Sequence, residues 1–444
     1  MTDNQMTLRS RIDDRTAPVG IIGMGYVGLP LMLAATARGF RVLGFDIDSP
    51  KVSGLNDGRS PLRHIAESRI ASARDAGLFA ATSDFGRLTE VDIVVICVPT
   101  PLGRHREPDL SFVRTTAENI ARRLRPGQLV ILESTSYPGT TNEIVRPILE
   151  ASGLKSGLDF FLAFSPERED PGNASYSTSQ IPRVVGGDDD AALSLACAFY
   201  AVLVEQVIPI ASTKTAEAVK VTENVFRAVN IALVNELKVI YSKMGIDVFE
   251  VIAAAKTKPF GFMPFYPGPG LGGHCIPIDP FYLTWRAREF GINTRFIELA
   301  GEINSEMPRY VVNRVAEVLD QQRGRGLSAA KVLVVGVAYK RDVDDTRESP
   351  ALVIIELLQQ RGAIVDYHDP LVGRIPKTRD HPKLAGMDSV PVTGGAVSRY
   401  DVVLIVADHT EIDWEKLIAA AQIVVDTRNV GARVTKGHHK IFPA

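Results

Sequence analysis

The sequence predicts an α/β protein in which two doubly wound domains are joined by a central helical domain with a long spine helix. In the first half of the chain, short apolar runs alternate with amphipathic stretches, as in a parallel sheet with helices between its strands. The same alternation restarts at Lys331. Between the two series, residues 214–237 carry apolar side chains at helical spacing without any glycine or proline. We therefore expect three domains, with the boundaries 1–211, 212–322 and 323–444.

The elements of the first domain follow from its apolar runs. Each run is short enough for a buried strand and begins after a polar turn. A glycine turn and a helix from Leu29 to Arg38 follow the first run. The predicted strands are 19–22, 42–46, 93–98 and 129–133.

The rest of the chain is read in the same way. The spine helix is predicted over 212–244. Residues 256–280 are rich in proline, glycine and aromatic side chains, which indicates a loop of defined shape, and 321–330 is predicted to be a connector. The last domain has predicted strands that begin at Lys331 and lie over 363–367, 402–406 and 423–426.

The composition excludes several kinds of partner. The 444 residues carry a formal net charge of -2, so no long-range field would gather nucleic acid. No run of 18 apolar residues occurs, and no membrane span is expected. The polar stretch from Met1 to Ala17 lacks the apolar core of a secretory signal and is expected to be a frayed chain end.

The three cysteines are Cys97, Cys197 and Cys275. They are far apart and fit no zinc pattern, so no metal is expected. Their odd number and the lack of an export signal predict a reducing, cytoplasmic compartment. Cys97 falls in a predicted strand and Cys197 in a predicted apolar helix, and both are interpreted as small core residues.

A dinucleotide site is predicted at the first glycine turn, which reads Gly23-Met-Gly25-Tyr26-Val27-Gly28. The turn follows a predicted strand and opens a predicted helix, whose first N–H groups and dipole favour a pyrophosphate. Asp46 ends the second strand, where a carboxylate accepts hydrogen bonds from the adenosine ribose and repels a 2′-phosphate. The arrangement predicts a Rossmann-like domain that binds NAD rather than NADP. Lys51 is interpreted either as a ribose or phosphate contact or as an exposed helical lysine.

Cys275 lies behind the glycine-rich stretch Pro267-Gly-Pro-Gly-Leu-Gly272-Gly273-His274. Glycines allow backbone N–H groups to converge and a ligand to approach closely, and such surroundings favour a thiolate. A cysteine in a protein that binds NAD suggests aldehyde oxidation through a thiohemiacetal and a thioester, which water then hydrolyses. His274 is interpreted as structural, because neighbouring side chains in an extended loop point apart.

The chain resembles the UDP-glucose/GDP-mannose dehydrogenase family over nearly its whole length. The blocks that carry this resemblance occur in the family's order. They are 23–28, 134–141, 165–168, 220–224, 270–275, 336–340 and 345–350. The resemblance implies an enzyme, an NAD-dependent nucleotide-sugar 6-dehydrogenase, that oxidises the C6 hydroxymethyl group of a nucleotide hexose to the uronic acid. One such oxidation consumes two NAD.

The resemblance also implies roles for individual residues. Lys220 and Asn224, which lie four apart and so share one helix face, would bind the C6 oxygen. The other catalytic residues implied are the nucleophile Cys275, the base Glu167, Asp279 to hold water or pair with Lys220, and Thr135 beside the nicotinamide. The further cofactor contacts are Thr100 and Arg347. The further substrate contacts are Gly272, Gly273, Tyr339, Lys340 and Arg428.

Some positions depart from the glucose branch of the family. Arg168 and Glu169 replace an apolar pair, Pro171 replaces a glutamate, and Pro259 stands where the glucose branch has an arginine that crosses the dimer, with Lys256 or Lys258 as substitutes. The pattern is nearest to the branch that acts on UDP-N-acetylhexosamines. UDP-glucose or a dTDP-hexose stays open as the substrate.

Two rival classes of protein are also considered. One is a two-electron dehydrogenase of the hydroxyacid type, which needs no cysteine. The other is a non-catalytic protein that senses NAD or serves in assembly. Whatever the function, the long apolar spine helix favours a homodimer.

Overall fold

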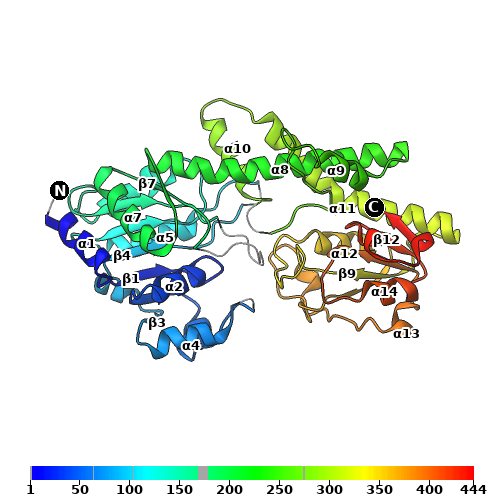
Figure 1. The fold of residues 1–444 in the computed structure, drawn as a ribbon, viewed down its shortest axis with the longest axis horizontal. Helices are drawn as coiled ribbons and strands as arrows, with labels where there is room; N and C mark the ends of the chain where they lie inside the picture. Colours follow the sequence, from blue (N-terminus) through cyan, green and yellow to red (C-terminus); the bar gives the residue numbers. More distant parts are fainter. Residues whose placement is uncertain (1–2, 64, 104, 169–178, 274–275) are drawn as a thin grey trace. The chain divides into compact units, whose positions relative to one another are not determined.

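The structure is a computed structural model that describes residues 3–63, 65–103, 105–168, 179–273 and 276–444 (Figure 1). The chain divides into two compact units. The first contains Met1–Glu223 and Phe281–Ile292, and the second contains Asn224–Pro280 and Asn293–Ala444. The predicted α/β class, with two doubly wound sheets and a long helix, is confirmed.

The first unit is built on an eight-stranded sheet with the strand order β3-β2-β1-β4-β5-β6-β7-β8. All neighbouring strands are parallel except β6 and β7. The order reverses between β1 and β4, and doubly wound sheets bind ligands at the carboxyl ends of the strands at such a reversal. The strands are β1 (Val19–Ile22), β2 (Val42–Phe45), β3 (Phe79–Thr82), β4 (Ile93–Ile96), β5 (Leu129–Leu132), β6 (Phe161–Phe164), β7 (Arg183–Gly187) and β8 (Val207–Ile210).

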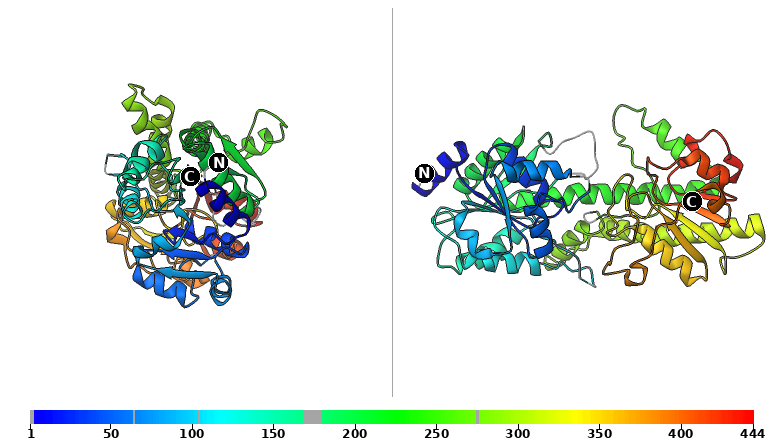
Figure 2. Two further views of the ribbon diagram at one scale, coloured as in Figure 1. Left: turned by 90° about the vertical axis from the view of Figure 1, so that its left-hand side faces the viewer. Right: turned by 90° about the horizontal axis from the view of Figure 1, so that it is seen from below.

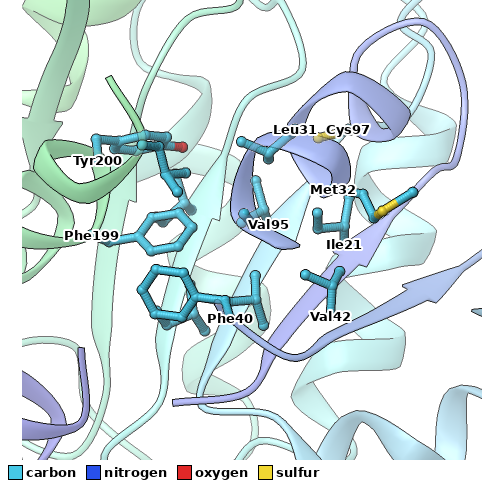
Figure 3. Close-up of a cluster of buried hydrophobic side chains, with 14 of the residues drawn as sticks. Ile21, Leu31, Met32, Phe40, Val42, Val95, Cys97, Phe199 and Tyr200 are labelled. Atoms are coloured by element: carbon cyan, nitrogen blue, oxygen red, sulfur yellow. The ribbon is translucent and has the colours of Figure 1, made fainter. Parts of the chain in front are cut away.

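The helices of the first unit are α1 (Asp3–Asp13), α2 (Gly28–Ala37), α3 (Ser49–Asn56), α4 (Glu67–Asp75), α5 (Ser111–Ala121), α6 (Arg146–Glu150), α7 (Asp190–Leu203) and α10 (Asp279–Glu289), which starts in the other unit. Most of them fall between the strands, but α1 precedes β1 and α10 follows β8. Figure 3 shows how side chains of α2 and α7 meet the strands in one core cluster. There the rings of Phe40 and Phe199 pack edge to face, with their centroids 5.6 Å apart.

The amino-terminal segment corrects one prediction. Residues 3–13 form α1 rather than a frayed end, and α1 packs against α7. Leu8 and Ile12 of α1 are 3% and 0% exposed, so two apolar residues one helical turn apart attach this helix to the core.

The spine helix is α8 (Thr213–Met244), a single run of 32 residues that matches the prediction over 212–244. It is the long unbroken green ribbon in Figure 1 and Figure 2. Gly245 follows it with a φ of 70°, the left-handed conformation that commonly ends a helix. Residues up to Glu223 belong to the first unit and those from Asn224 to the second.

The second unit holds a five-stranded parallel sheet with the order β10-β9-β11-β12-β13. Its strands are β9 (Lys331–Val335), β10 (Ile364–His368), β11 (Val402–Ile405), β12 (Val424–Asp426) and β13 (Ile441–Pro443). Its helices, apart from its part of α8, are α9 (Val248–Ala255), α11 (Arg295–Arg323), α12 (Pro350–Gln360), α13 (Gly394–Val397) and α14 (Trp414–Ala420). Asn235 of α8 donates to Asn304 of α11, which ties the two long helices together.

Two smaller predictions also change. The predicted connector 321–330 begins with the last three residues of α11, which ends at Arg323. Cys97 lies one residue beyond β4 instead of within it, but it is 9% exposed and belongs to the core cluster as predicted. Cys197 lies in α7 and packs against the same cluster.

Candidate functional site

The glycine turn after β1 has the shape that a dinucleotide needs. Gly23 has a φ of 96°, and a Cβ atom there would lie 2.4 Å from the carbonyl oxygen of Cys97. A Cβ atom on Gly28 would lie 2.0 Å from the carbonyl oxygen of Gly23. A Cβ atom on Gly25 would meet nothing within 4 Å. The outer glycines are therefore required by the backbone, and Gly25 faces open space near the start of α2, where the sequence predicts the pyrophosphate of a dinucleotide.

Asp46 directly follows β2 and supports this turn. One carboxylate oxygen accepts from the backbone N–H of Met24 at 3.0 Å, and the other accepts from the N–H of Asp48 at 3.0 Å. The Nζ of Lys51 lies 2.9 Å from the first oxygen. Asp46 is thus in the place predicted for a ribose contact, and Lys51 neutralises its charge.

Thr100 lies just beyond β4, at the same end of the sheet. It is buried, and its backbone carbonyl accepts a hydrogen bond from the hydroxyl of Tyr282. Tyr26 and Val27 complete the turn and pack against the core cluster. The predicted cofactor residues of the first unit therefore gather at the carboxyl ends of β1, β2 and β4.

Glu167 follows β6 and lies beside a buried ion pair that sequence reasoning missed. Arg183, the first residue of β7, places its Nη1 3.5 Å from the Oε2 of Glu167 and forms an ion pair with Glu133. The hydroxyl of Tyr200 donates to Glu133. Burial raises the pKa of Glu133, and the positive charge of Arg183 opposes that shift. Arg183 and its partners therefore hold the carboxylate of Glu167 in one place.

The same cluster disfavours ionisation of the Cys97 thiol. Burial raises the pKa of its thiol well above the ordinary value, and the charge of Glu133 raises it further. Because the thiolate is the reactive form, Cys97 is unsuited to be a nucleophile.

Glu217 anchors the 134–141 segment, which contains Thr135, to α8. Its carboxylate accepts from the backbone N–H groups of Gly139 and Thr141 and from the hydroxyl of Thr141. Burial raises the pKa of Glu217 to about 7, although these hydrogen bonds oppose the shift. Thr135 itself is half-buried.

Lys220 and Asn224 both lie on α8, and each is 7% exposed. The spacing of four puts them on one helix face, as predicted. The amide nitrogen of Asn224 donates to the carboxylate of Asp279, which is 1% exposed at the start of α10. Asp279 thereby fixes the orientation of the Asn224 side chain.

The glycine-rich loop packs against Tyr339 in the second unit. A Cβ atom on Gly272 or on Gly273 would lie 2.6 or 2.9 Å from the side chain of Tyr339. The N–H of Gly273 donates to the carbonyl of Arg347 at 3.1 Å. Gly273 is needed because the aromatic ring fills the space a side chain would take, and Gly272 because the Cβ atom of Tyr339 lies there. His274 and Cys275 lie outside the described residues.

The positively charged site residues predicted in the second unit, Arg428, Arg347 and Lys340, each have different contacts. Arg428 follows β12 and donates from Nε to the carbonyl of Val406 at 2.8 Å. Arg347 is ion-paired with Asp345, and the Nζ of Lys340 is 5.8 Å from the ring centroid of Tyr339. Lys238, which belongs to no predicted site, is buried close to Arg428.

Three domain models of one protein family match the chain. They are described as the NAD binding domain, the central domain and the UDP binding domain of the UDP-glucose/GDP-mannose dehydrogenase family, and they match residues 17–204, 214–306 and 333–433.

Individual relatives are similar over most of their length. A UDP-N-acetyl-D-glucosamine 6-dehydrogenase of Pseudomonas aeruginosa is 35% identical over 395 residues, which are 88% of this chain and 90% of that protein. A UDP-N-acetyl-D-mannosamine dehydrogenase of Pyrococcus horikoshii is 35% identical over 422 residues, 93% and 95% of the two chains. The solved structure of a UDP-D-ManNAc dehydrogenase from Pyrococcus horikoshii has a TM-score of 0.83 at 33% identity and covers 93% of this chain and 95% of its own.

Proposed function

Because the chain belongs to the UDP-glucose/GDP-mannose dehydrogenase family, we propose that it oxidises the C6 hydroxymethyl group of a UDP-N-acetylhexosamine to a carboxylate. The family itself, NAD as the cofactor and a nucleotide-sugar dehydrogenase activity were predicted from the sequence and are confirmed. The hydroxyacid-type and non-catalytic readings are set aside by the same matches. The choice of sugar and the covalent mechanism are the proposal.

The observation that carries the mechanism is the buried polar face of α8. Lys220 and Asn224 place an ammonium and an amide donor on it, and Asp279 orients the amide. Donors held rigidly in a buried site stabilise an oxyanion better than water does, because they need no reorganisation during the reaction. We assign these two donors to the C6 oxygen.

The remaining roles are assigned as follows. Cys275 attacks the C6 aldehyde and carries the acyl group as a thioester. Glu167, held by Arg183, is the base that activates water for hydrolysis, and Thr135 contacts the same water. The turn at 23–28 with Asp46, Lys51 and Thr100 would hold NAD, which would supply the hydride acceptor both for the alcohol and for the conversion of the Cys275 thiohemiacetal to the thioester. Arg347 is assigned to the cofactor, and Gly272, Gly273, Tyr339, Lys340 and Arg428 to the substrate.

The acetamido sugar is favoured by the relatives. Those named above at 35% identity are dehydrogenases of UDP-N-acetyl-D-glucosamine and UDP-N-acetyl-D-mannosamine. Arg168, which stands where the glucose branch has an apolar residue, forms an ion pair with Glu223 at 2.6 Å. UDP-glucose and dTDP-glucose are the alternatives.

The test is a panel of UDP-glucose, UDP-N-acetylglucosamine, UDP-N-acetylgalactosamine, UDP-N-acetylmannosamine and dTDP-glucose, scored by NADH formed per uronic acid. We expect two NADH per acid and the highest kcat/KM with an acetamido sugar. Cys275→Ser should abolish acid formation. Release of one NADH per molecule, or acid formation by the serine variant, would refute the mechanism, and a preference for UDP-glucose would refute the substrate.

A homodimer is also part of the proposal. Phe226, Leu233 and Ile240 of α8 follow one another at intervals of seven and are 46% to 49% exposed, and Met244 is 63% exposed. Such a stripe of exposed apolar residues on a long helix suits packing against its copy. Light scattering should give twice the mass of the chain, and Leu233→Glu with Ile240→Glu should give a monomer.

Two further assignments complete the proposal. The three domains are 1–211, 212–322 and 323–444, in line with the three matched segments. The protein acts in the cytoplasm, as the unpaired thiols of Cys97 and Cys197 suggest. Among the described residues, no helix is long and apolar enough to cross a membrane.

A further inference from the structure

Lys238 is a buried lysine of α8 to which the proposed mechanism gives no role. Its side chain is 5% exposed, and its Nζ has no hydrogen-bond partner among the described residues. A buried ammonium without a partner is strongly unfavourable, so such a group either loses its proton or receives its partner from a ligand. The groups around Lys238 show how both can apply, one in the free protein and the other in the complex.

The charged groups that face Lys238 are Arg428 and Asp426, at the end of β12. The Asp426 carboxylate is already engaged, because it accepts from the backbone N–H groups of Arg428 and Gly431 at 2.9 and 2.8 Å. Burial and the charge of Arg428 together lower the pKa of Lys238 to about 7, although the charge of Asp426 opposes the shift. Burial and the charge of Arg341 lower the pKa of Arg428 to about 10, and Asp426 opposes this shift as well. Two cations thus share one carboxylate.

The cluster lies where the second unit is built to receive a ligand. Asn235, one turn before Lys238 on α8, accepts from the N–H of Gly268 at 3.0 Å. A Cβ atom on Gly268 would lie 2.7 Å from the Nη1 of Arg428. The turn of α8 that holds Lys238, the glycine-rich loop and the carboxyl end of β12 therefore meet. The carboxyl ends of parallel strands are where open α/β sheets bind ligands.

We propose that Lys238 is a further substrate-binding residue, whose ammonium donates hydrogen bonds to oxygen atoms of the nucleotide sugar beside Arg428. The inference rests on the proposed function, since it takes the nucleotide sugar as the ligand. An ammonium offers three donors and no acceptor, which suits a cluster of acceptor oxygens. The excess of positive charge favours the diphosphate as the source of these oxygens, and the oxygens of the sugar are the other source.

The proposal predicts that binding takes up a proton. In the free protein the amine is partly neutral near pH 7.5, and an anionic ligand restores its charge. Calorimetric titration with the nucleotide sugar, in two buffers of different ionisation enthalpy, should show fractional proton uptake at pH 7.5 that largely disappears at pH 6. The titration uses the unmodified protein, so it does not depend on whether any variant folds.

The variant Lys238→Met tests whether Lys238 is the group that takes up the proton and binds the substrate. Methionine roughly keeps the length of the side chain and removes its charge. We expect the KM for the nucleotide sugar to rise at least tenfold, the KM for NAD to stay within twofold and the proton uptake to vanish. The matched control is Lys243→Met, an exposed lysine on the same helix, which should change none of these values. Binding of UDP alone shows which oxygen atoms Lys238 contacts. Weaker UDP binding in Lys238→Met would mean that it contacts the diphosphate, and unchanged UDP binding would mean that it contacts the sugar.

Two results would overturn the proposal. One is an unchanged KM for the nucleotide sugar in Lys238→Met. The other is proton uptake that is absent from the unmodified protein. A variant that binds NAD and the nucleotide sugar equally poorly and melts at a lower temperature would make Lys238 structural, which also overturns it. If the unmodified protein oxidises no nucleotide sugar, the proposed function fails instead, and the binding of UDP still tests Lys238.

Discussion

The two units of the chain contain the same structural turn and use it differently. In each unit a glycine with positive φ follows the first strand of the parallel sheet, Gly23 at 96° and Gly336 at 85°. In each, an aspartate directly follows the neighbouring strand and accepts hydrogen bonds from the backbone of that turn. Asp46 does so in the first unit and Asp369 in the second.

The difference lies in what remains available around each aspartate. Asp46 is paired with Lys51, and Gly25 in its turn faces open space. The side chain of Asp369 is 0% exposed and contacts the Nε2 of His409 at 3.1 Å. It also accepts from the N–H groups of Val337, Ala338, Leu371 and Val372. A glycine turn followed by an acid is therefore shared by both sheets, and we expect the cofactor at the turn with open space.

The largest effect on stability should appear when Asp369 and Asp46 are each replaced by alanine in separate variants. Asp369→Ala leaves several buried donors without an acceptor, and we expect it to lower the free energy of unfolding by roughly 4 kcal/mol. Asp46→Ala should cost about 1 kcal/mol or less, because its site is less enclosed, but it should weaken NAD binding. Urea denaturation and NAD titration of both variants measure the contrast. Equal stability losses would show that the two turns do not differ as described.

Two buried acids, Glu217 and Asp369, should make the stability of the protein depend on pH with opposite signs. Glu217 has its pKa raised to about 7, so its stabilising contribution is complete below pH 4.5 and is lost as the pH rises through 7. The loss amounts to roughly 3 kcal/mol. Burial acts to raise the pKa of Asp369, but the hydrogen bond and charge of His409 outweigh it, and the pKa is lowered. Its contribution is therefore lost only as the pH falls below about 4.

Denaturation of Glu217→Gln between pH 4.5 and 8 tests the first sign. The variant should lose the decline in stability that the unmodified protein shows over this range. A decline of the same size in both proteins would remove Glu217 as its cause.

The third comparison is between two glycines, Gly336 and Gly25. Replacing the first should affect stability, and replacing the second should affect NAD binding. Gly336→Ala combines a positive φ with a Cβ atom 2.5 Å from the carbonyl of Ala407, so it should destabilise the protein by roughly 2 kcal/mol. Gly25→Val should leave stability within about 0.5 kcal/mol, because a Cβ atom at this position has no neighbour within 4 Å, and should weaken NAD binding at least tenfold. Melting temperatures and NAD titrations decide the matter. Tight NAD binding by Gly25→Val would mean that the open space is not the cofactor site.

The smallest effect should come from Lys51→Met. The pair with Asp46 is partly exposed, so its loss should change stability by less than about 1 kcal/mol. We expect NAD binding to weaken only a few fold. A change above tenfold would indicate that Lys51 contacts NAD directly.

Much of the architecture could be predicted because apolar runs and glycine turns are local signals. The strands β1, β2, β4 and β5 and the helix α8 lie within two residues of their predicted limits. The helix α1 was missed because only Leu8 and Ile12 carry its packing, and a mostly polar segment gives a weak pattern. Its partner α7 lies far along the chain.

The candidate site was predicted less completely. Residues to which the family resemblance points, such as Lys220, Asn224 and Asp279, could be named in advance. Arg183 and Lys238 could not, because a charged residue is ordinarily exposed and nothing in the local sequence shows that it is buried. Only the folded structure brings Glu133 to Arg183 and Arg428 to Lys238.

The contact between the glycine-rich loop and Tyr339 limits how this protein can change over time. The ring of Tyr339 takes the space of a side chain at 273, whereas the obstacle at 272 is the Cβ atom of Tyr339, which every residue except glycine has. Position 272 should therefore stay glycine among descendants of this sequence, and a larger residue at 273 should appear only together with a smaller one at 339.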